Sequence, residues 1–225
     1  MTPQSSPRQG VHVIDPVKVL SKSKIRLSPI LDSKGRADLT VAMLKDVLFA
    51  LSNARRVESV TVVSAARKLR RVADQFRSEF IWEGRRRGLN RALMLAIKHV
   101  VKRGRSAILV IHADLPFVTG REVDEFLARS SRYEVAFNPS KDEDGTNALF
   151  LQSAEMIKPA FGKNSYEKYV ALARTKGLRY KVVKLNRIGS DIDEPKDFLQ
   201  LMSHHGGRNT GLFMQSWLGK IDPRH

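Results

Sequence analysis

The chain has 225 residues, of which 42% are hydrophobic, and this is enough for one sizeable core, so a single domain is expected. It contains no cysteine, which excludes disulfides, thiolate metal sites and cysteine nucleophiles, and it has no apolar run long enough to span a membrane. Forty Lys and Arg residues against 23 Asp and Glu give a net charge of +17, which favours anionic partners such as nucleotides, phosphorylated metabolites, nucleic acid or acidic membranes.

In chain order, short β-branched or apolar runs alternate with segments of helical periodicity. The predicted strands are 11–17, 59–64, 107–111, 133–137, 148–151 and 180–185. The predicted helices are 36–51, 65–75, 89–103, 119–130, 166–176 and 195–202. Strands separated by helices are typical of a mostly parallel sheet that is covered by helices on both faces, so the predicted fold class is α/β.

We expect residues 11–203 to form this domain, with 1–10 and 204–225 as terminal extensions. The last segment is only weakly amphipathic and is expected to pack loosely. The first ten residues are polar and contain no apolar segment of signal-peptide length, so a cytoplasmic location is expected.

Ligands of such folds gather beyond the carboxyl ends of the strands, so polar residues that follow a strand are the candidates. The first candidate is the basic loop after strand 11–17, which carries Lys18, Lys24 and Arg26. Lysine point charges and the planar fork of arginine suit a phosphate. A solvated basic loop is the alternative, although apolar residues within the loop indicate that it packs against the domain.

Three aspartates form the second candidate. Asp114 directly follows the most hydrophobic strand, while Asp191 and Asp193 lie two apart on an extended segment and should point the same way. They could converge on Mg²⁺, which prefers a few carboxylates together with phosphate oxygens and water. The alternatives are that Asp114 caps a turn and that the other two serve a helix N-terminus.

The third candidate combines Thr146 in the run DGTN with Gly162 and Ser165 in the run FGKNS. Glycine permits close approach of the backbone to a ligand, and the hydroxyl groups can donate to a phosphate or carboxylate. Ser165 also precedes a predicted helix, whose N-terminus favours anions. Either run alone would be an ordinary turn or helix cap.

Taken in order, the segments PVKVLSKSKIRLSP, GLNRAL, HADLP, DGTNALFL, FGKNS and SDIDEP resemble the guanylyltransferases of coenzyme F-420 biosynthesis, over about residues 13–202. The resemblance implies a single-domain nucleotidyltransferase fold of the Rossmann or GT-A type that uses GTP and Mg²⁺. It implies that Asp114, Asp191 and Asp193 bind metal and that Thr146, Gly162 and Ser165 hold a phosphorylated acid. It also implies that Lys18, Lys24 and Arg26 contact the GTP phosphates, with Gly88 and Asn90 near the nucleoside.

The predicted function is therefore transfer of GMP from GTP to the phosphate of phosphoenolpyruvate, 2-phospho-L-lactate or 3-phospho-D-glycerate, with Asp114, Lys24 and Arg26 as catalytic residues. One alternative is a nucleotidyltransferase with a molybdopterin or sugar-phosphate acceptor, although the first loop is not glycine-rich. A basic nucleic-acid-binding protein is the other, but only 7% of residues are aromatic and no recognition motif is present. Neither a nucleic acid nor a membrane is expected as a partner, and the oligomeric state is left open.

Overall fold

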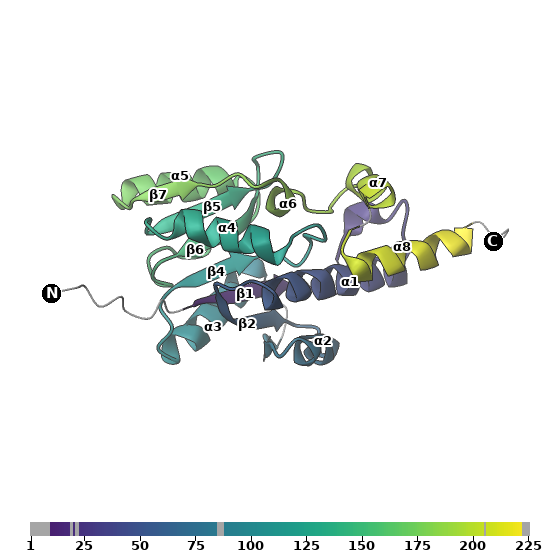
Figure 1. Ribbon diagram of the computed structural model, residues 1–225, viewed down its shortest axis with the longest axis horizontal. Helices are drawn as coiled ribbons and strands as arrows, with labels where there is room; N and C mark the ends of the chain where they lie inside the picture. Colours follow the sequence, from purple (N-terminus) through teal and green to yellow (C-terminus); the bar gives the residue numbers. More distant parts are fainter. Residues whose placement is uncertain (1–9, 19, 21–22, 85–87, 205, 222–225) are drawn as a thin grey trace.

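The computed structural model describes residues 10–18, 20, 23–84, 88–204 and 206–221. Its centre is a seven-stranded sheet with the strand order β3-β2-β1-β4-β6-β5-β7 (Figure 1). The strands are β1 (Val11–Val17), β2 (Val57–Ser64), β3 (Glu79–Trp82), β4 (Ile108–Ile111), β5 (Val135–Pro139), β6 (Thr146–Leu151) and β7 (Tyr180–Val182). Strand β6 runs antiparallel to both of its neighbours, and the other neighbouring pairs are parallel. The prediction of a mostly parallel α/β sheet is confirmed.

Helices cover both faces of this sheet. They are α1 (Ser33–Ser52), α2 (Arg70–Gln75), α3 (Leu89–Lys102), α4 (Gly120–Ser130), α5 (Ser165–Thr175), α6 (Asn186–Gly189), α7 (Pro195–His204) and α8 (Arg208–Ile221), with short 3₁₀ turns η2 (Ile25–Leu27) and η3 (Arg67–Leu69). Helices α1 and α4 pack on one face and α3 and α5 on the other. No helix in the described part of the chain combines the length and apolar character needed to cross a lipid bilayer.

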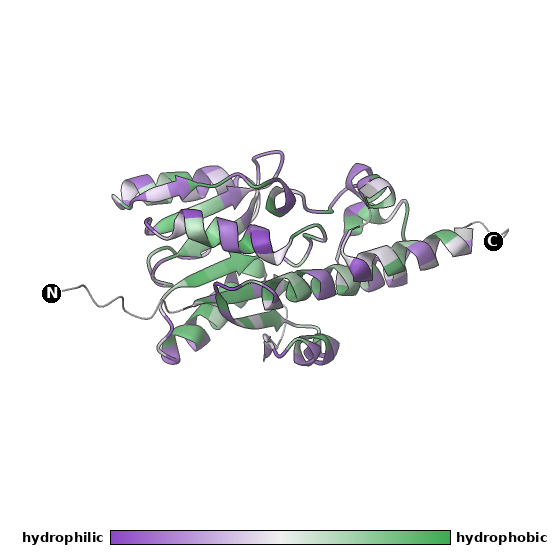
Figure 2. Cartoon of the chain, in the orientation of Figure 1, coloured by the Kyte–Doolittle hydropathy of each residue, from purple (hydrophilic) through white to green (hydrophobic). Residues whose placement is uncertain are grey.

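Alternation along the strands produces the two core layers. In β1, Val13 and Val17 face the layer of α1, whereas Ile14 faces the layer of α3. Because both faces are buried, the strands are apolar almost throughout, and Figure 2 shows them as mostly green between helices that are green on one side only. The four residues of β4 are almost fully buried, as the strongest hydrophobic run of the sequence predicts.

The expectation that the C-terminal segment packs loosely is wrong for residues 208–221. These residues form α8, which packs along α1. The buried carboxylate of Asp46 on α1 accepts hydrogen bonds from the backbone N–H groups of Asn209 and Thr210 at 2.9 and 2.8 Å, and from both of their side chains. The first turn of α8 is thus capped by a side chain from another helix, a contact that no local pattern reveals. The domain boundary at residue 203 stays a prediction.

Candidate active site

Segments far apart in the sequence meet at one edge of the sheet because β6 runs opposite to its neighbours. Strand β4 ends at Ile111, which pairs with Ala148, so the start of β6 lies beside the residues that follow β4. The N–H of His112 donates to the carbonyl of Asn147 at 3.2 Å and extends this pairing beyond the strand. The predicted hydroxyl and metal sites therefore share one edge.

A cavity of about 750 Å³ opens at this edge. Its lining includes the predicted residues Lys18, Arg26, Asp114, Thr146, Gly162, Ser165, Asp191 and Asp193. A smaller recess of about 70 Å³ shares part of this wall and contains Lys24. Another hollow, of about 1050 Å³, lies between α1, α4 and α8, but Asp46, the acidic side chain among its described lining residues, is occupied in capping α8. The smaller, more polar cavity is the candidate site.

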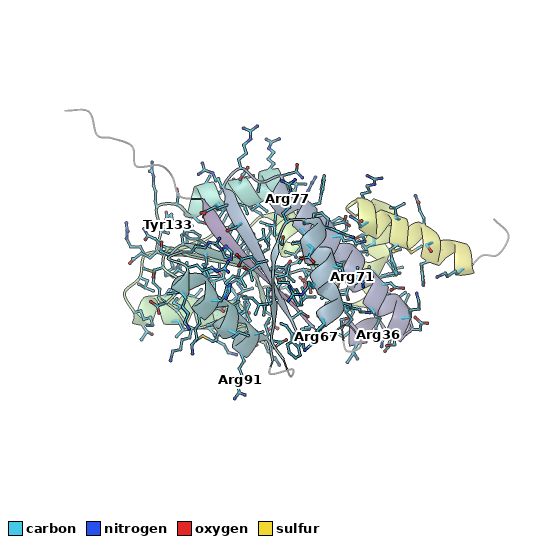
Figure 3. The ribbon with its side chains drawn as sticks, turned by 90° about the horizontal axis from the view of Figure 1, so that it is seen from below. Arg36, Arg67, Arg71, Arg77, Arg91 and Tyr133 are labelled. Atoms are coloured by element: carbon cyan, nitrogen blue, oxygen red, sulfur yellow. The ribbon has the colours of Figure 1, made fainter. Side chains whose placement is uncertain are left out.

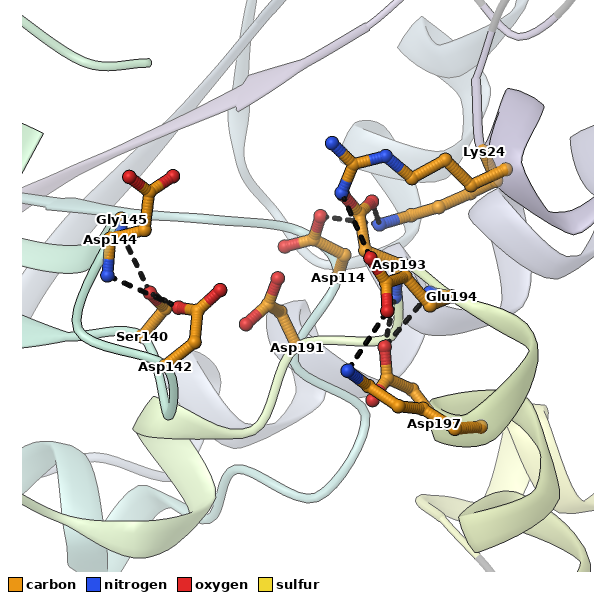
Figure 4. A network of polar contacts seen from close by, with 12 residues as sticks. Lys24, Asp114, Ser140, Asp142, Asp144, Gly145, Asp191, Asp193, Glu194 and Asp197 are labelled. Carbon is orange, nitrogen blue, oxygen red and sulfur yellow. Dashed lines mark hydrogen bonds and ion pairs between the residues drawn. The ribbon is translucent and has the colours of Figure 1, made fainter. Parts of the chain in front are cut away.

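Lys24 is held between two of the three aspartates (Figure 4). Its Nζ donates to Asp114 Oδ2 at 2.6 Å and to Asp193 Oδ1 at 2.8 Å, and the side chain is only 6% exposed. Burial lowers the pKa of Lys24, but the charges and hydrogen bonds of the two carboxylates outweigh it and raise the pKa to about 12. Burial likewise raises the pKa of Asp114, and the charge of Lys24 reverses this and lowers it to about 2. Lys24 and Asp114 are therefore charged at neutral pH.

Asp191 faces the same space as Asp114. The Asn147 side chain donates to Asp191 Oδ1 at 3.0 Å, and the backbone N–H of Ile192 donates to the carbonyl of Asp114 at 3.1 Å, which holds the two acidic segments together. Burial and then the charge of Asp114 raise the pKa of Asp191 to about 6. Two carboxylates that repel each other in a buried site favour a bound cation.

Several features of the site fit Mg²⁺. Asp114 Oδ1 is buried and has no hydrogen-bond partner among the described residues, so it is available as a ligand. Asp191 and Asp193 line the same cavity, which also leaves room for phosphate oxygens and water. Within the described ranges, however, no three acidic or histidine side chains form a ready-made metal cage. The predicted ligands are thus brought to one cavity with Lys24 bridging two of them.

Arg26 links the basic loop to the acidic segment in the cavity wall. Its Nη1 lies 3.5 Å from Asp193 Oδ2 and 3.4 Å from Glu194 Oε1, and its side chain is largely exposed. Lys18 lines the cavity without an ion pair to any described residue. Lys18 and Arg26 are therefore both placed to meet an anionic ligand in the cavity.

The predicted hydroxyl groups lie together at the start of α5. Ser165 Oγ donates to Thr146 Oγ1 at 3.3 Å, and both side chains are buried. Gly162 has a φ of 122°, a backbone conformation that residues other than glycine rarely adopt. This conformation shapes the turn before α5. Thr146, Gly162 and Ser165 thus line one part of the cavity wall, where the backbone N–H groups of Asn164 and Ser165 already donate to Asp144 and to the carbonyl of Gly162.

The predicted nucleoside residues are placed differently. Leu89 lines the cavity, whereas Gly88 and Asn90 are not among the described residues of its wall. The Asn90 side chain instead donates to the carbonyl of Phe161 at 3.0 Å and accepts from the Phe161 N–H at 2.9 Å. Asn90 therefore fixes the turn that carries Gly162.

Sequence reasoning gave no role to two polar residues near the site. Asn147, which positions Asp191, lies within the DGTN run, so its place in that motif was a usable signal. Asp15 is fully buried in β1 and has no hydrogen-bond partner among the described residues. An acid inside the apolar run VHVIDPV is the signal that could have identified it.

Most of the excess positive charge lies elsewhere. The exposed residues Arg67, Arg71, Arg77 and Arg91 come from η3, α2, the turn after α2, and α3 (Figure 3), and none lines the candidate cavity. Arg67 lies over the ring of Trp82 at 3.7 Å from its centroid. These four arginines are therefore part of the solvated surface and not of the candidate site.

The chain is similar to a known protein family and to named enzymes over most of its length. Residues 11–225 match the family described as "Guanylyl transferase CofC like". A phosphoenolpyruvate guanylyltransferase of Sphaerobacter thermophilus is 34% identical over 84% of this chain and 91% of its own length. A 2-phospho-L-lactate guanylyltransferase of Methanocaldococcus jannaschii is 28% identical over 95% of this chain and 92% of its own.

The fold is also known from solved structures. A nucleotidyl transferase from Methanothermobacter thermautotroptrophicus superposes with a TM-score of 0.62, covering 92% of this chain and 99% of that one. The two sequences are only 13% identical, so this likeness concerns the fold alone.

Proposed function

Because the chain belongs to the guanylyl transferase CofC-like family, we propose that it transfers GMP from GTP to the phosphate of a small phosphorylated carboxylic acid in coenzyme F-420 biosynthesis. The observation that best supports this is the meeting of a basic loop, three aspartates and two buried hydroxyl groups at one cavity. Relatives named for phosphoenolpyruvate and for 2-phospho-L-lactate indicate the class of acceptor.

In the proposed reaction, a phosphate oxygen of the acid attacks the α-phosphorus of GTP. A new P–O bond forms, the bond from the α-phosphorus to the bridging oxygen breaks, and pyrophosphate leaves with the electron pair. No general base is needed, since a phosphate attacker is already ionised near neutral pH. Because every reactant is an anion, positioning and charge neutralisation should supply most of the rate enhancement.

Each group of cavity residues has a proposed role in this reaction. Asp114, Asp191 and Asp193 are the proposed ligands of Mg²⁺, which when bound supplies positive charge to the reacting phosphates. The basic loop residues Lys18, Lys24 and Arg26 would contact the triphosphate and steady the departing pyrophosphate. Thr146, Gly162 and Ser165 would hold the acid through hydroxyl and backbone donors at the start of α5. The segment that carries Gly88 and Asn90 is proposed to lie near the nucleoside.

A pyrophosphate-release assay tests this proposal. Purified protein is incubated with GTP, Mg²⁺ and phosphoenolpyruvate, 2-phospho-L-lactate or 3-phospho-D-glycerate in turn, with ATP and CTP as nucleotide controls and lactate as an acceptor without phosphate. Release that needs GTP and one phosphorylated acid, with formation of the GMP adduct by mass spectrometry, would support it. Absence of release with every acid would contradict it. Cytoplasmic location and the lack of a nucleic-acid partner remain predictions.

A further inference from the structure

A buried ammonium group lies on the oxygens that the proposed function assigns to a metal ion. Lys24 Nζ donates to Asp114 at 2.6 Å and to Asp193 at 2.8 Å (Figure 4). Building on the proposed function, we propose that Lys24 competes with the divalent ion for these two carboxylates and exchanges them for nucleotide phosphate when the ion binds. Lys24 would then couple metal binding to nucleotide binding.

Competition follows from the closeness of the charges. The Lys24 side chain is 6% exposed and that of Asp114 is 24% exposed, so little water separates them. A divalent cation on the same carboxylates would lie within a few ångströms of the ammonium, where repulsion between like charges is strong and weakly screened. The ammonium group and the divalent cation therefore cannot both bind these carboxylate oxygens as tightly as either would alone.

There is space beside the Lys24 side chain into which its ammonium group can move. The recess of about 70 Å³ around Lys24 shares Lys18, His112 and Asp114 with the wall of the larger cavity, so a short movement would bring the ammonium to a bound phosphate. The backbone beside it is anchored, because Thr40 Oγ1 of α1 donates to Ser23 Oγ at 2.9 Å. The exchange therefore needs rotation of a flexible side chain and no movement of the backbone at Ser23 and Lys24.

The backbone conformation of Lys24 indicates that the fold determines where its side chain lies. Its φ of 50° and ψ of 40° fall in the left-handed region, which few residues other than glycine occupy. Such a conformation persists where surrounding contacts maintain it, and it directs the side chain between the two aspartates here. The contact is thus part of the fold and not an accident of an exposed lysine.

Metal titration of three proteins without nucleotide tests the competition. We would measure Mn²⁺ binding by isothermal titration calorimetry for the wild type, Lys24→Met and Lys163→Met. Lys163 lines the same cavity but has no ion pair among the described residues, so its variant removes the same charge without freeing a carboxylate. Lys24→Met should bind Mn²⁺ about tenfold more tightly than the wild type, and Lys163→Met within about twofold. Equal or weaker binding by Lys24→Met would overturn the proposal.

A second measurement uses the wild type alone, because removing a buried charge partner can prevent folding. Reductive methylation followed by peptide mass spectrometry reports the accessibility of each lysine, with the exposed Lys34 as internal reference. Saturating Mg²⁺ should raise the modification rate of Lys24 relative to Lys34 about fivefold, and a non-hydrolysable GTP analogue should lower it again. A Lys24 rate that Mg²⁺ leaves unchanged would show that the lysine keeps its carboxylates and would refute the exchange.

The outcomes separate this inference from the proposed function. If GMP transfer depends on Mg²⁺ while Lys24→Met gains no Mn²⁺ affinity, the exchange is wrong and the function stands. If neither protein binds Mn²⁺ and no acid accepts GMP, the proposed function fails and the exchange fails with it.

Discussion

Asp15 offers the sharpest test of the energetics, because replacing this buried acid with valine should stabilise the protein. Its side chain is fully buried in β1, neither carboxyl oxygen has a hydrogen-bond partner among the described residues, and its strand neighbours on the same face are Val13 and Val17. Burying a neutral polar group without a partner costs roughly 1–3 kcal/mol. Valine is of similar size and suits a buried strand, so Asp15→Val should recover about 2 kcal/mol.

The gain should grow with pH. Burial, and then the charge of Asp114, raise the pKa of Asp15 well above its usual value. The folded protein therefore keeps this proton after the unfolded chain has lost it, so the wild type loses stability as pH rises from about 4 to the raised pKa. The loss is about 1.4 kcal/mol per pH unit in that window. Asp15→Val has no such proton, and its advantage should be larger at pH 7 than at pH 5.

Thermal unfolding at pH 5 and pH 7 measures both effects. A gain of about 2 kcal/mol corresponds to a rise in Tm of roughly 4–8 °C for a chain of this size. Asp46→Val is the matched control, because this buried carboxylate accepts four hydrogen bonds, and its loss should destabilise the protein by about 3 kcal/mol. A lower Tm for Asp15→Val, or an advantage that does not grow with pH, would refute the reasoning.

Three further predictions address two residues of the candidate site, Asp114 and Ser165, and the buried His12 of β1. Asp114→Asn should lower kcat/KM for GMP transfer by about 100-fold or more, and a smaller effect in steady-state kinetics would argue against its role at the metal. Ser165→Ala should raise KM for the acid roughly tenfold and leave KM for GTP nearly unchanged, and an effect on GTP alone would move the acid site elsewhere. Burial, and then the charge of Arg105, lower the pKa of His12 to about 4. The unfolded chain therefore takes up this proton first, and up to about 3 kcal/mol of folding stability should be lost as the pH falls from 6.5 to 4. Urea unfolding should show a smaller loss over this pH range for His12→Gln than for the wild type.

The sequence alone determined most of the regular elements and the edge of the sheet that carries the site. Hydrophobic runs located β1, β2 and β4, and helical periodicity located α1, α3 and α4, since these patterns depend on neighbouring residues. Strand β3 has only four residues, three half-buried and one exposed, and α6 has one turn, so neither produces a pattern long enough to detect. The rule that ligands bind beyond strand ends then selected Asp114 and the basic loop without any knowledge of strand order.

Only the tertiary structure decided which of these groups touch. Lys24 and Asp193 are 169 positions apart, and their 2.8 Å contact depends on where the acidic segment returns to the sheet. The reversed β6 brings Asn147 to Asp191, and α8 lies along α1 because Asp46 caps it. Local patterns report the conformational preference and burial of a segment, whereas a contact between distant side chains is set by the packing of the whole chain.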